Sequence, residues 1–474
     1  MTAASEQDSS GDSQLERDIG LLGAVSLGVG TMIAGGIFVL SGLAVSNVGA
    51  AAVVSFLLAA VVASLTALAY AEFATIYTVD GGGYEYVAEV FDSELTFFVG
   101  WLMILGYPAS AAFYLASFAE WFRRFVAPAV AFPAAVPYWS VGLAVLGVLV
   151  AVNLLGAEET GTFQVVVTAL KVALIVLFLW GGLRAFDPGV VSASMARNFP
   201  HLGDVALTSA LVFITFFGFE AIATSGGEIE APERTIPRAI FLSIGLVTVL
   251  YALVVVVVVI AVNDETFLQF LADHTRLESP ARASSFVAEN GEVAMGRAAQ
   301  YYLGDAGFWV FVLGALLSMV SAANATVLAG SRVKLAMAQH DHLPERFERV
   351  HPRHHVPHYA VLLTGALIAA FILVFTVALA RSPGFHPGLD AMAHFADFML
   401  LSGLVAVNVA LVRSRRKYPD RERPFEVPGV PWVPEVAVLS NLALLANVRG
   451  ESLLLGLFAL AVGAVVRAVV VDTG

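Results

Sequence analysis

The chain has no cysteine and little charge. Of its 474 residues, 58% are hydrophobic and only 13% are charged. Because no thiol is present, disulfide bonds, thiolate metal sites and thiol catalysis are excluded. Soluble domains carry about 25% charged residues, so too few charges are available here to cover a water-facing surface of ordinary size. The composition therefore excludes an ordinary soluble protein.

Lysine is almost absent, since it occurs only at Lys171, Lys334 and Lys417, while the formal net charge is -13. Excess acid with so little lysine is typical of adaptation to a salty cytoplasm, where screening weakens the repulsion between like charges. A GC-rich coding sequence, which favours arginine over lysine, is the alternative explanation. Under either explanation the chain has no basic stripe, so we expect no nucleic-acid partner.

The chain begins without the basic region and apolar core of a signal peptide. Residues 1–18 are polar and acidic, and we interpret them as a disordered cytoplasmic tail. Apolar stretches near the bilayer-spanning length of about 20 residues follow. We predict twelve spans, at residues 21–45, 50–71, 95–121, 136–155, 162–183, 205–225, 238–262, 307–330, 357–379, 392–412, 431–447 and 452–471. The predicted fold class is an all-α membrane protein of about twelve transmembrane helices.

An even number of spans places both termini on one side of the membrane. If that side is the cytoplasm, 15 of the 25 lysines and arginines lie in the inner segments and at the inner ends of the spans. The outer segments hold nine, and the last, Lys171, lies within a span. The densest basic clusters, 332–353 and 413–423, both fall inside. The positive-inside rule therefore predicts a multi-pass protein of the cell membrane with cytoplasmic termini. An amphipathic stretch at 293–303 predicts a short helix over the outer mouth.

Two spans are interrupted by glycine in a similar way. Residues 28–42 read GVGTMIAGGIFVLSG and residues 213–227 read FITFFGFEAIATSGG. Glycine costs about 1 kcal/mol in a helix interior, and paired interruptions in two halves of a chain are typical of a transporter's central site. The alternative is that small residues only let helices pack closely. At 34–36 we favour unwinding, because adjacent glycines lie on different helix faces.

Several blocks in order resemble the amino acid–polyamine–organocation (APC) superfamily of secondary transporters. The first three are TMIAGGIF at 31–38, YAEF at 70–73 followed by GGGYEY at 81–86, and GFE at 218–220 followed by EIEAPERTIPRAI at 228–240. The last two are a segment at 331–344 that begins with SR and ends with LP, and a segment at 423–428 that begins with RPF and ends with P. The resemblance covers residues 17 to about 430. It implies two inverted five-helix repeats, residues 19–183 and 205–412, followed by two peripheral helices at 431–471.

The resemblance also implies where a substrate binds. The backbone N–H groups of Gly35 and Gly36 would hold an α-carboxylate, and the carbonyls of Met32, Ile214 and Phe217 would meet an α-amine. The expected substrate-binding residues are Met32, Ile33, Ala34, Gly35, Gly36, Phe213, Ile214, Phe216, Phe217 and Gly218. The chain departs from the family in three places. Ala34 and Gly35 stand where the family often has Gly and Ser, and Ile214 stands where many members have a gating aromatic residue. The residues before the glycines at 81–83, Thr78, Val79 and Asp80, lack the family's usual proline.

Lys171 is an ionisable residue about ten positions inside span 5, which is near the bilayer midplane. Such residues indicate function. In the resembling family a lysine in this span replaces a bound sodium ion, so sodium coupling is disfavoured. Ser318 and Ser321 are candidate oxygen partners. Lys171 could exchange a proton during the cycle or serve as a fixed charged strut in a uniporter or exchanger. Glu220 is either a buried carboxylate on the pathway or a structural hydrogen-bonding group.

Other polar residues carry weaker predictions. His394 and Asp397 are three apart, hence on one helix face, and form either a relay or a structural pair. The histidines of residues 340–358 match no well-formed metal site, so we expect no metal and no cofactor. No nucleophile–base pair occurs in the spans, and the chain is not expected to be an enzyme.

The function predicted from the sequence is secondary transport of an amino acid, with protons as a further candidate partner. A polyamine or another amine is an alternative substrate, which would leave the Gly35 and Gly36 amides without a carboxylate. A non-transporting amino acid receptor is a second alternative. The short tail and the end of the chain after span 12 leave no room for a signalling domain, so the receptor is disfavoured.

Overall fold

The structure is a computed structural model that describes residues 17–33, 35–77, 81–91, 93–133, 135–199, 201–275, 286–287, 291–378, 389–446, 448 and 450–470. Residues 1–16 of the predicted tail lie outside the described residues, as does Ala34. Among the described residues the regular secondary structure is helical, apart from one isolated bridge between Ile19 and Ile229.

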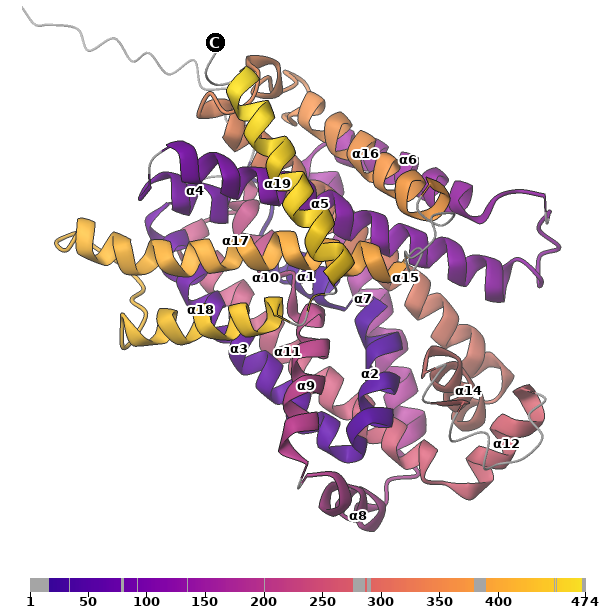
Figure 1. Ribbon diagram of the computed structural model, residues 1–474. Coiled ribbons are helices and arrows are strands. Elements are labelled where there is room, and N and C mark those ends of the chain that lie inside the picture. Colours follow the sequence, from indigo (N-terminus) through magenta and orange to yellow (C-terminus); the bar gives the residue numbers. More distant parts are fainter. Residues whose placement is uncertain are drawn as a thin grey trace, which may run out of the picture.

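The main helices follow the predicted spans in order (Figure 1). Their bounds are α1 (Leu21–Met32), α2 (Gly35–Val48), α3 (Ala52–Ile76), α4 (Gly83–Ala88), α5 (Ser93–Trp121), α6 (Tyr138–Leu155), α7 (Ala157–Leu183), α8 (Pro188–Asn198), α9 (Leu202–Val212), α10 (Phe219–Thr224), α11 (Pro232–Val262), α12 (Glu265–Thr275), α14 (Gly291–Leu303), α15 (Asp305–Gln339), α16 (His358–Leu373), α17 (Leu389–Lys417), α18 (Trp432–Leu445) and α19 (Gly450–Val470). Short 3-10 or π turns extend or connect several of them, including η3 (Phe213–Phe216) and η4 (Gly226–Glu228).

Nine helical stretches of the described chain are long and apolar enough to cross a membrane without interruption. The remaining three predicted spans fall short for visible reasons. Span 1 is divided into α1 and α2, span 6 is divided into α9 and α10, and α18 has only 14 residues. The prediction of an all-α membrane protein with about twelve helices is confirmed.

The apolar runs become helices because lipid cannot satisfy backbone N–H and C=O groups. The clearest case is α11, which contains six consecutive valines at 254–259. Valine favours strands in water, but a lone strand in a bilayer would leave its amides unpaired. Pro232 stands at the start of this helix, where its missing N–H has no helical partner to lose.

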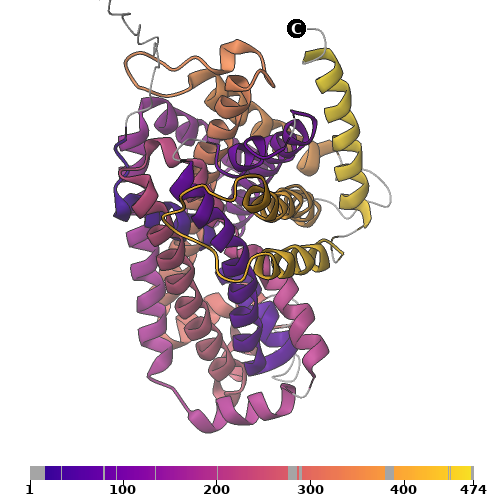
Figure 2. The same cartoon turned by 90° about the vertical axis from the view of Figure 1, so that its left-hand side faces the viewer.

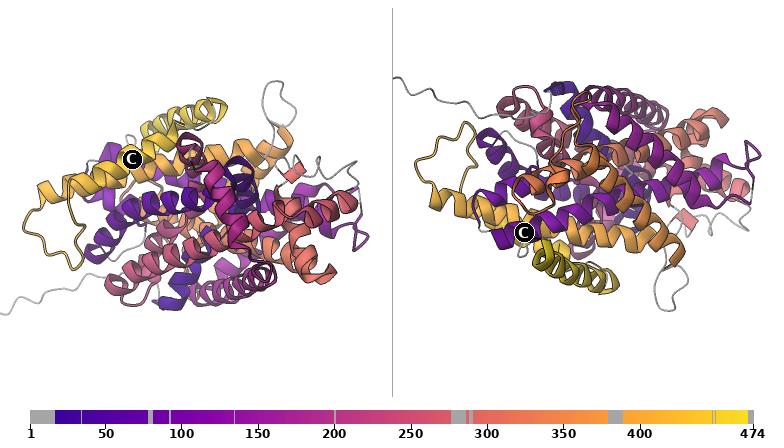
Figure 3. Two further views of the ribbon diagram at one scale, coloured as in Figure 1. Left: turned by 90° about the horizontal axis from the view of Figure 1, so that it is seen from below. Right: turned by 90° about the horizontal axis from the view of Figure 1, so that it is seen from above.

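The long helices α5 and α15 pack against each other near the centre of the bundle. A Cβ on Gly330 of α15 would lie 3.2 Å from Tyr107 of α5, so the two backbones approach closely. α17 also packs on α5, while α19 lies at the edge of the bundle (Figure 2). The loop between α17 and α18 and the helices α12 and α14 lie at opposite ends (Figure 3). α14 contains the amphipathic stretch predicted at 293–303.

Candidate transport site

The first feature of the site is the break in span 1. α1 ends at Met32, and Ile33 has φ -78° and ψ 64°, outside the helical region. α2 then begins at Gly35. The Val29 carbonyl oxygen still accepts from the Ile33 amide at 2.9 Å, but the carbonyl oxygens that follow it in the last turn of α1 lack the amides that a continuous helix would supply. The interruption falls within the glycine-rich segment where the sequence predicts it.

Lys171 on α7 fills part of this break. Its Nζ donates to the carbonyl oxygens of Gly30 at 2.7 Å and Ile33 at 3.1 Å, and to Ser321 Oγ at 3.1 Å. The side chain is fully buried. An ammonium has three donors, so these three acceptors match all of them. Ser318, the other predicted partner, donates instead to the carbonyl oxygen of Gly314 in its own helix, at 2.7 Å.

Two further polar residues of α7 support this contact. Gln164 Nε2 donates to Ser321 Oγ at 2.7 Å and lies 3.2 Å from the carbonyl oxygen of Ser26, which Thr168 Oγ1 also reaches at 3.2 Å. Together with Lys171 they are spaced four and three residues apart, so they form one stripe along α7 facing α1. Our sequence analysis missed both residues, although this polar spacing within an apolar span was a usable signal.

The second feature is the break in span 6. After α9 the chain tightens into η3, and Gly218 has φ 139° before α10 begins at Phe219. This φ is one that glycine adopts readily and other residues rarely do. The Gly218 amide donates to Glu220 Oε2 at 3.0 Å, and the Glu220 side chain is 3% exposed. Glu220 therefore lies directly at the break.

The two breaks face each other. A Cβ on Gly36 would come within 3.0 Å of Thr215 Cβ, and a Cβ on Gly218 would come within 3.0 Å of the Met32 amide nitrogen. Glycine thus permits the close approach of the backbones on both sides. Tyr251 of α11 adds a contact that the sequence did not indicate, because its hydroxyl donates to the Met32 carbonyl oxygen at 2.8 Å.

Buried aromatic rings surround the span 6 break. Phe213 and Phe217 meet edge to face with ring centroids 5.6 Å apart, and Phe216 meets Tyr251 at 5.7 Å. All four residues are at most 4% exposed. The backbone of Ile214 belongs to η3, while its side chain lies outside what the structure describes. These rings are available as an apolar wall beside the two breaks.

A buried ion pair lies where the N-terminal segment meets the rest of the bundle. Arg332 Nε donates to Glu228 Oε2 at 3.0 Å, a second guanidinium nitrogen contacts Oε1, and both side chains are at most 1% exposed. The Ile19 amide donates to the Glu228 carbonyl oxygen at 2.9 Å. The N-terminal segment, the loop after α10 and α15 are thereby joined.

A second buried carboxylate, that of Glu72, binds several partners from distant segments. Glu72 of α3 accepts two hydrogen bonds from Arg415 at 2.9 and 2.8 Å and one from the Val427 amide at 2.7 Å. Arg423 Nε lies 3.2 Å from the same carboxylate. Glu72 therefore connects α3 with α17 and with the segment that leads to α18.

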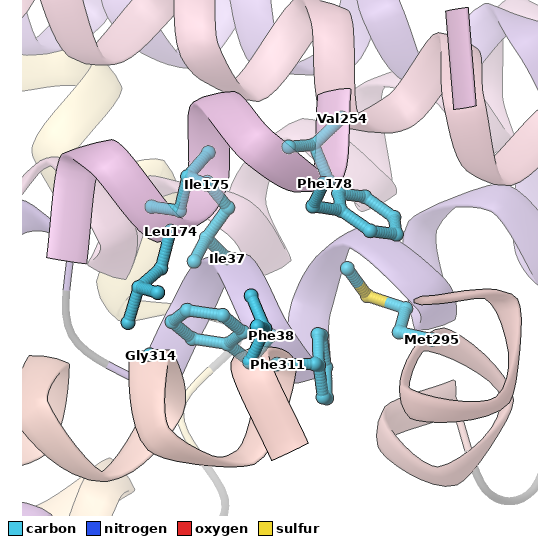
Figure 4. A pocket seen from close by; sticks show the side chains of 10 residues that line it. Ile37, Phe38, Leu174, Ile175, Phe178, Val254, Met295, Phe311 and Gly314 are labelled. Carbon is cyan, nitrogen blue, oxygen red and sulfur yellow. The ribbon is translucent and has the colours of Figure 1, made fainter. Parts of the chain in front are cut away.

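A small apolar cavity lies beside α2 (Figure 4). It has a volume of about 10 Å³, which is about enough for one water molecule. Its lining residues come from α2, α7, α11, α14 and α15 and are Ile37, Phe38, Leu174, Ile175, Phe178, Val254, Met295, Val310, Phe311 and Gly314. None of them is a predicted substrate-binding residue, and nothing polar lines the cavity to orient an amino acid.

The sequence matches the amino acid permease family over residues 19–465. The chain belongs to this family. It is 27% identical to the branched-chain amino acid permease BcaP of Bacillus subtilis over 472 residues, which is 96% of this chain and 93% of that protein. It is 26% identical to the serine/threonine exchanger SteT of the same organism, over 95% of this chain and 97% of that protein.

A further relative is an uncharacterized transporter of Mycobacterium tuberculosis, 33% identical over 75% of this chain and 74% of that protein. The resemblance inferred from the sequence blocks is thereby confirmed. This member of the amino acid permease family is a multi-pass membrane transporter and not an enzyme.

Proposed function

We propose that this permease carries an amino acid across the cell membrane by alternating access. The meeting of the two helix breaks, α1 to α2 and η3 to α10, is the observation that carries the proposal. Broken helices at membrane depth are tolerated where they line a site, and transporters use them to bind substrate. The names of BcaP and SteT support an amino acid as the substrate.

The substrate would bind through its backbone groups. α2 begins at Gly35, so the amides of Gly35 and Gly36 have no carbonyl partner within the helix. The positive end of the helix dipole favours an anion there, which suits the α-carboxylate. The α-amine would meet carbonyls of the two breaks, including that of Met32, which keeps one lone pair beside its bond from Tyr251.

Transport would be independent of sodium, because the Lys171 ammonium already supplies a cation to the carbonyls of the span 1 break. The fully matched donors favour a charged strut in this state. A proton-coupled cycle requires that Lys171 release its proton in another state. Both possibilities predict exchange without sodium, and they differ in their response to a pH gradient.

We place both termini in the cytoplasm. We call Glu72 and its partners Arg415, Arg423 and Val427 the Glu72 cluster. We assign this cluster to the same end of the bundle as Ile19 and Arg332. The positive-inside rule assigns an end rich in arginine to the cytoplasm. The Glu228–Arg332 pair and the Glu72 cluster would then hold the inner end closed, and they would separate when the site opens inward.

Counterflow of labelled amino acids in proteoliposomes tests the proposal, with and without sodium and with and without a pH gradient. We expect uptake of at least one amino acid that does not change with sodium. Lys171→Met should abolish it, whereas Leu170→Met, on the exposed side of the same helix at 48% exposure, should not. Failure of every amino acid to exchange would refute transport. Sodium-dependent uptake would refute the role given to Lys171.

A further inference from the structure

The short helix α4 lies between the second half of span 6 and the end of α15. The Gly81 amide donates to the carbonyl oxygen of Thr224, the last residue of α10, at 3.1 Å. A Cβ on Gly82 would lie 2.8 Å from the Thr224 amide nitrogen, and a Cβ on Gly81 would lie 2.5 Å from Ala336 Cβ of α15. A displacement of α10 would therefore disturb the residues that lead into α4.

Two histidines after α15 bind α4 directly. α15 ends at Gln339. His340 Nε2 lies 2.9 Å from Glu85 Oε2 and 3.1 Å from Oε1, and His342 Nδ1 lies 2.8 Å from the Tyr84 hydroxyl oxygen. The Tyr84 ring also meets both imidazoles edge to face, at 5.7 and 6.1 Å between centroids. Two neighbouring residues of α4 are thus bound to the turn after α15, while the preceding glycines contact α10.

The two histidines differ in how they respond to pH. His342 is 4% exposed, and burial lowers its pKa, so it is neutral and keeps its bond to Tyr84 at neutral pH. The His340 side chain is 41% exposed, and its hydrogen bond to Glu85 raises its pKa. The charged pair is complete below the ordinary histidine pKa of about 6.5 and weakens as the pH rises through the raised value. One contact is constant, and the other titrates.

The carboxylates around His340 favour its protonated form. Glu89 follows one turn after Glu85, with its amide bonded to the Glu85 carbonyl oxygen at 3.0 Å, and Asp341 is the next residue in the chain. Both carboxylates raise the pKa of His340. Burial raises the pKa of Glu85 itself, and the bond to His340 opposes this rise. Because Glu85 loses its charge as the pH falls and His340 loses its charge as the pH rises, the alkaline side of the profile belongs to His340.

Basic side chains near α4 are directed to other groups. Arg467 of α19 lies 3.1 Å from Glu94 of α5. On α17, Arg413 lies over the Phe91 ring at 4.5 Å, and Lys417 donates to the Val90 carbonyl oxygen at 3.3 Å. These contacts leave the exposed histidine as the ion-pair partner of the α4 carboxylate.

We propose that the contacts of His340 with Glu85 and of His342 with Tyr84 form a latch, through which acid in the cytoplasm slows the transporter. The inference rests on the proposed function and its orientation, in which the inner end must open for release. While His340 is charged, its pair with Glu85 holds α4 against α10 and α15, and the inner end opens less often. When His340 becomes neutral, the pair weakens and α4 moves aside with α10. The regulating proton stays on the latch and is not carried across, so the effect needs no pH gradient.

A buried cysteine on α4 reports the latch without transport. The chain has no cysteine, and Val87→Cys places a single thiol on α4 where the native side chain is fully buried. The rate of labelling by a maleimide is divided by the rate for denatured protein at the same pH, which removes the pH dependence of the thiol itself. A partly exposed ion pair changes an equilibrium about threefold. We expect the divided rate to rise about threefold as the pH rises above about 6.5.

Variants on both sides of the pair separate the latch from general loosening. His340→Gln and Glu85→Gln keep a neutral hydrogen bond but cannot form the charged pair, so their divided rates should change much less with pH. His201→Gln, the same change at an exposed residue between α8 and α9, should keep the wild-type profile. Equal profiles in wild type and His340→Gln would overturn the inference.

Counterflow at equal pH on both sides tests the effect on transport. Wild-type amino acid exchange should rise about threefold over the same pH range, and His340→Gln should flatten this dependence. Labelling that changes with pH while exchange does not would overturn the inference and leave amino acid transport standing. No exchange of any amino acid at any pH would instead defeat the proposed function itself.

Discussion

The buried pair of Glu228 and Arg332 allows a quantitative prediction about closure of the cytoplasmic end. In Glu228→Gln the guanidinium of Arg332, 1% exposed, loses its counter-charge while remaining buried. Breaking a buried pair from one side costs about 3–5 kcal/mol. If the pair is separated in the inward-open state, the cost falls on the closed state alone. A change of about 3 kcal/mol shifts the equilibrium toward the open state about 100-fold.

The absence of cysteine makes this shift measurable. A single Ser225→Cys replacement places a thiol at the end of α10, where the native side chain is fully buried. We expect a maleimide reagent to label this thiol about 100-fold faster in the Glu228→Gln background. Glu345→Gln is the matched control, because that carboxylate is 82% exposed and lies 3.6 Å from Arg349, and such surface pairs contribute about 0–1 kcal/mol.

The double variant Glu228→Gln and Arg332→Gln separates electrostatics from simple loosening. It removes the stranded charge, so labelling should fall back toward the wild-type rate. If Glu228→Gln labels no faster than Glu345→Gln, the pair does not hold the end closed. If the double variant labels as fast as the single one, loss of packing rather than an unpaired charge is the cause.

Three further outcomes are expected. Gly36→Val should abolish counterflow in protein that still elutes as a single folded species, because the added side chain would meet Thr215. Glu72→Gln should lower thermal stability by about 3 kcal/mol, since two arginines lose a buried carboxylate, and an unchanged midpoint would refute this. The hydrogen bond to Glu85 raises the pKa of His340, so their contact is complete below the ordinary histidine pKa of about 6.5 and weakens as pH rises through the raised value. Thermal stability should therefore fall as the pH rises above about 6.5 in wild type and fall less in His340→Gln, and equal pH profiles would contradict this reasoning.

Much of the fold was predictable because bilayers impose strong rules on composition. Long apolar runs had to become helices, and the glycines near position 35 marked the point where α1 gives way to α2. Lys171 was identifiable as well, since an isolated lysine in an apolar span is conspicuous. These features depend on local sequence, where composition and periodicity carry the information.

Contacts between distant segments were less predictable. Ser318 and Ser321 share one face of α15, and which of them reaches Lys171 depends on how deeply α7 and α15 pack. The Tyr251 hydroxyl meets Met32 across 219 positions of sequence, and no local pattern indicates that pair. Partners of this kind are set by helix packing, which is why the sequence located the breaks but not all the side chains around them.

The carboxylate of Glu72 has a mechanical consequence. Its two oxygen atoms receive Arg415 and Val427 and lie against Arg423. A slide of α3 along α17 by about 1.5 Å, the rise of one helical residue, would stretch all of these bonds at the same moment. Bonds that must break together give no stable halfway position. We therefore expect this end of the molecule to change between two discrete arrangements, abruptly, and not through a continuous series of partly opened ones.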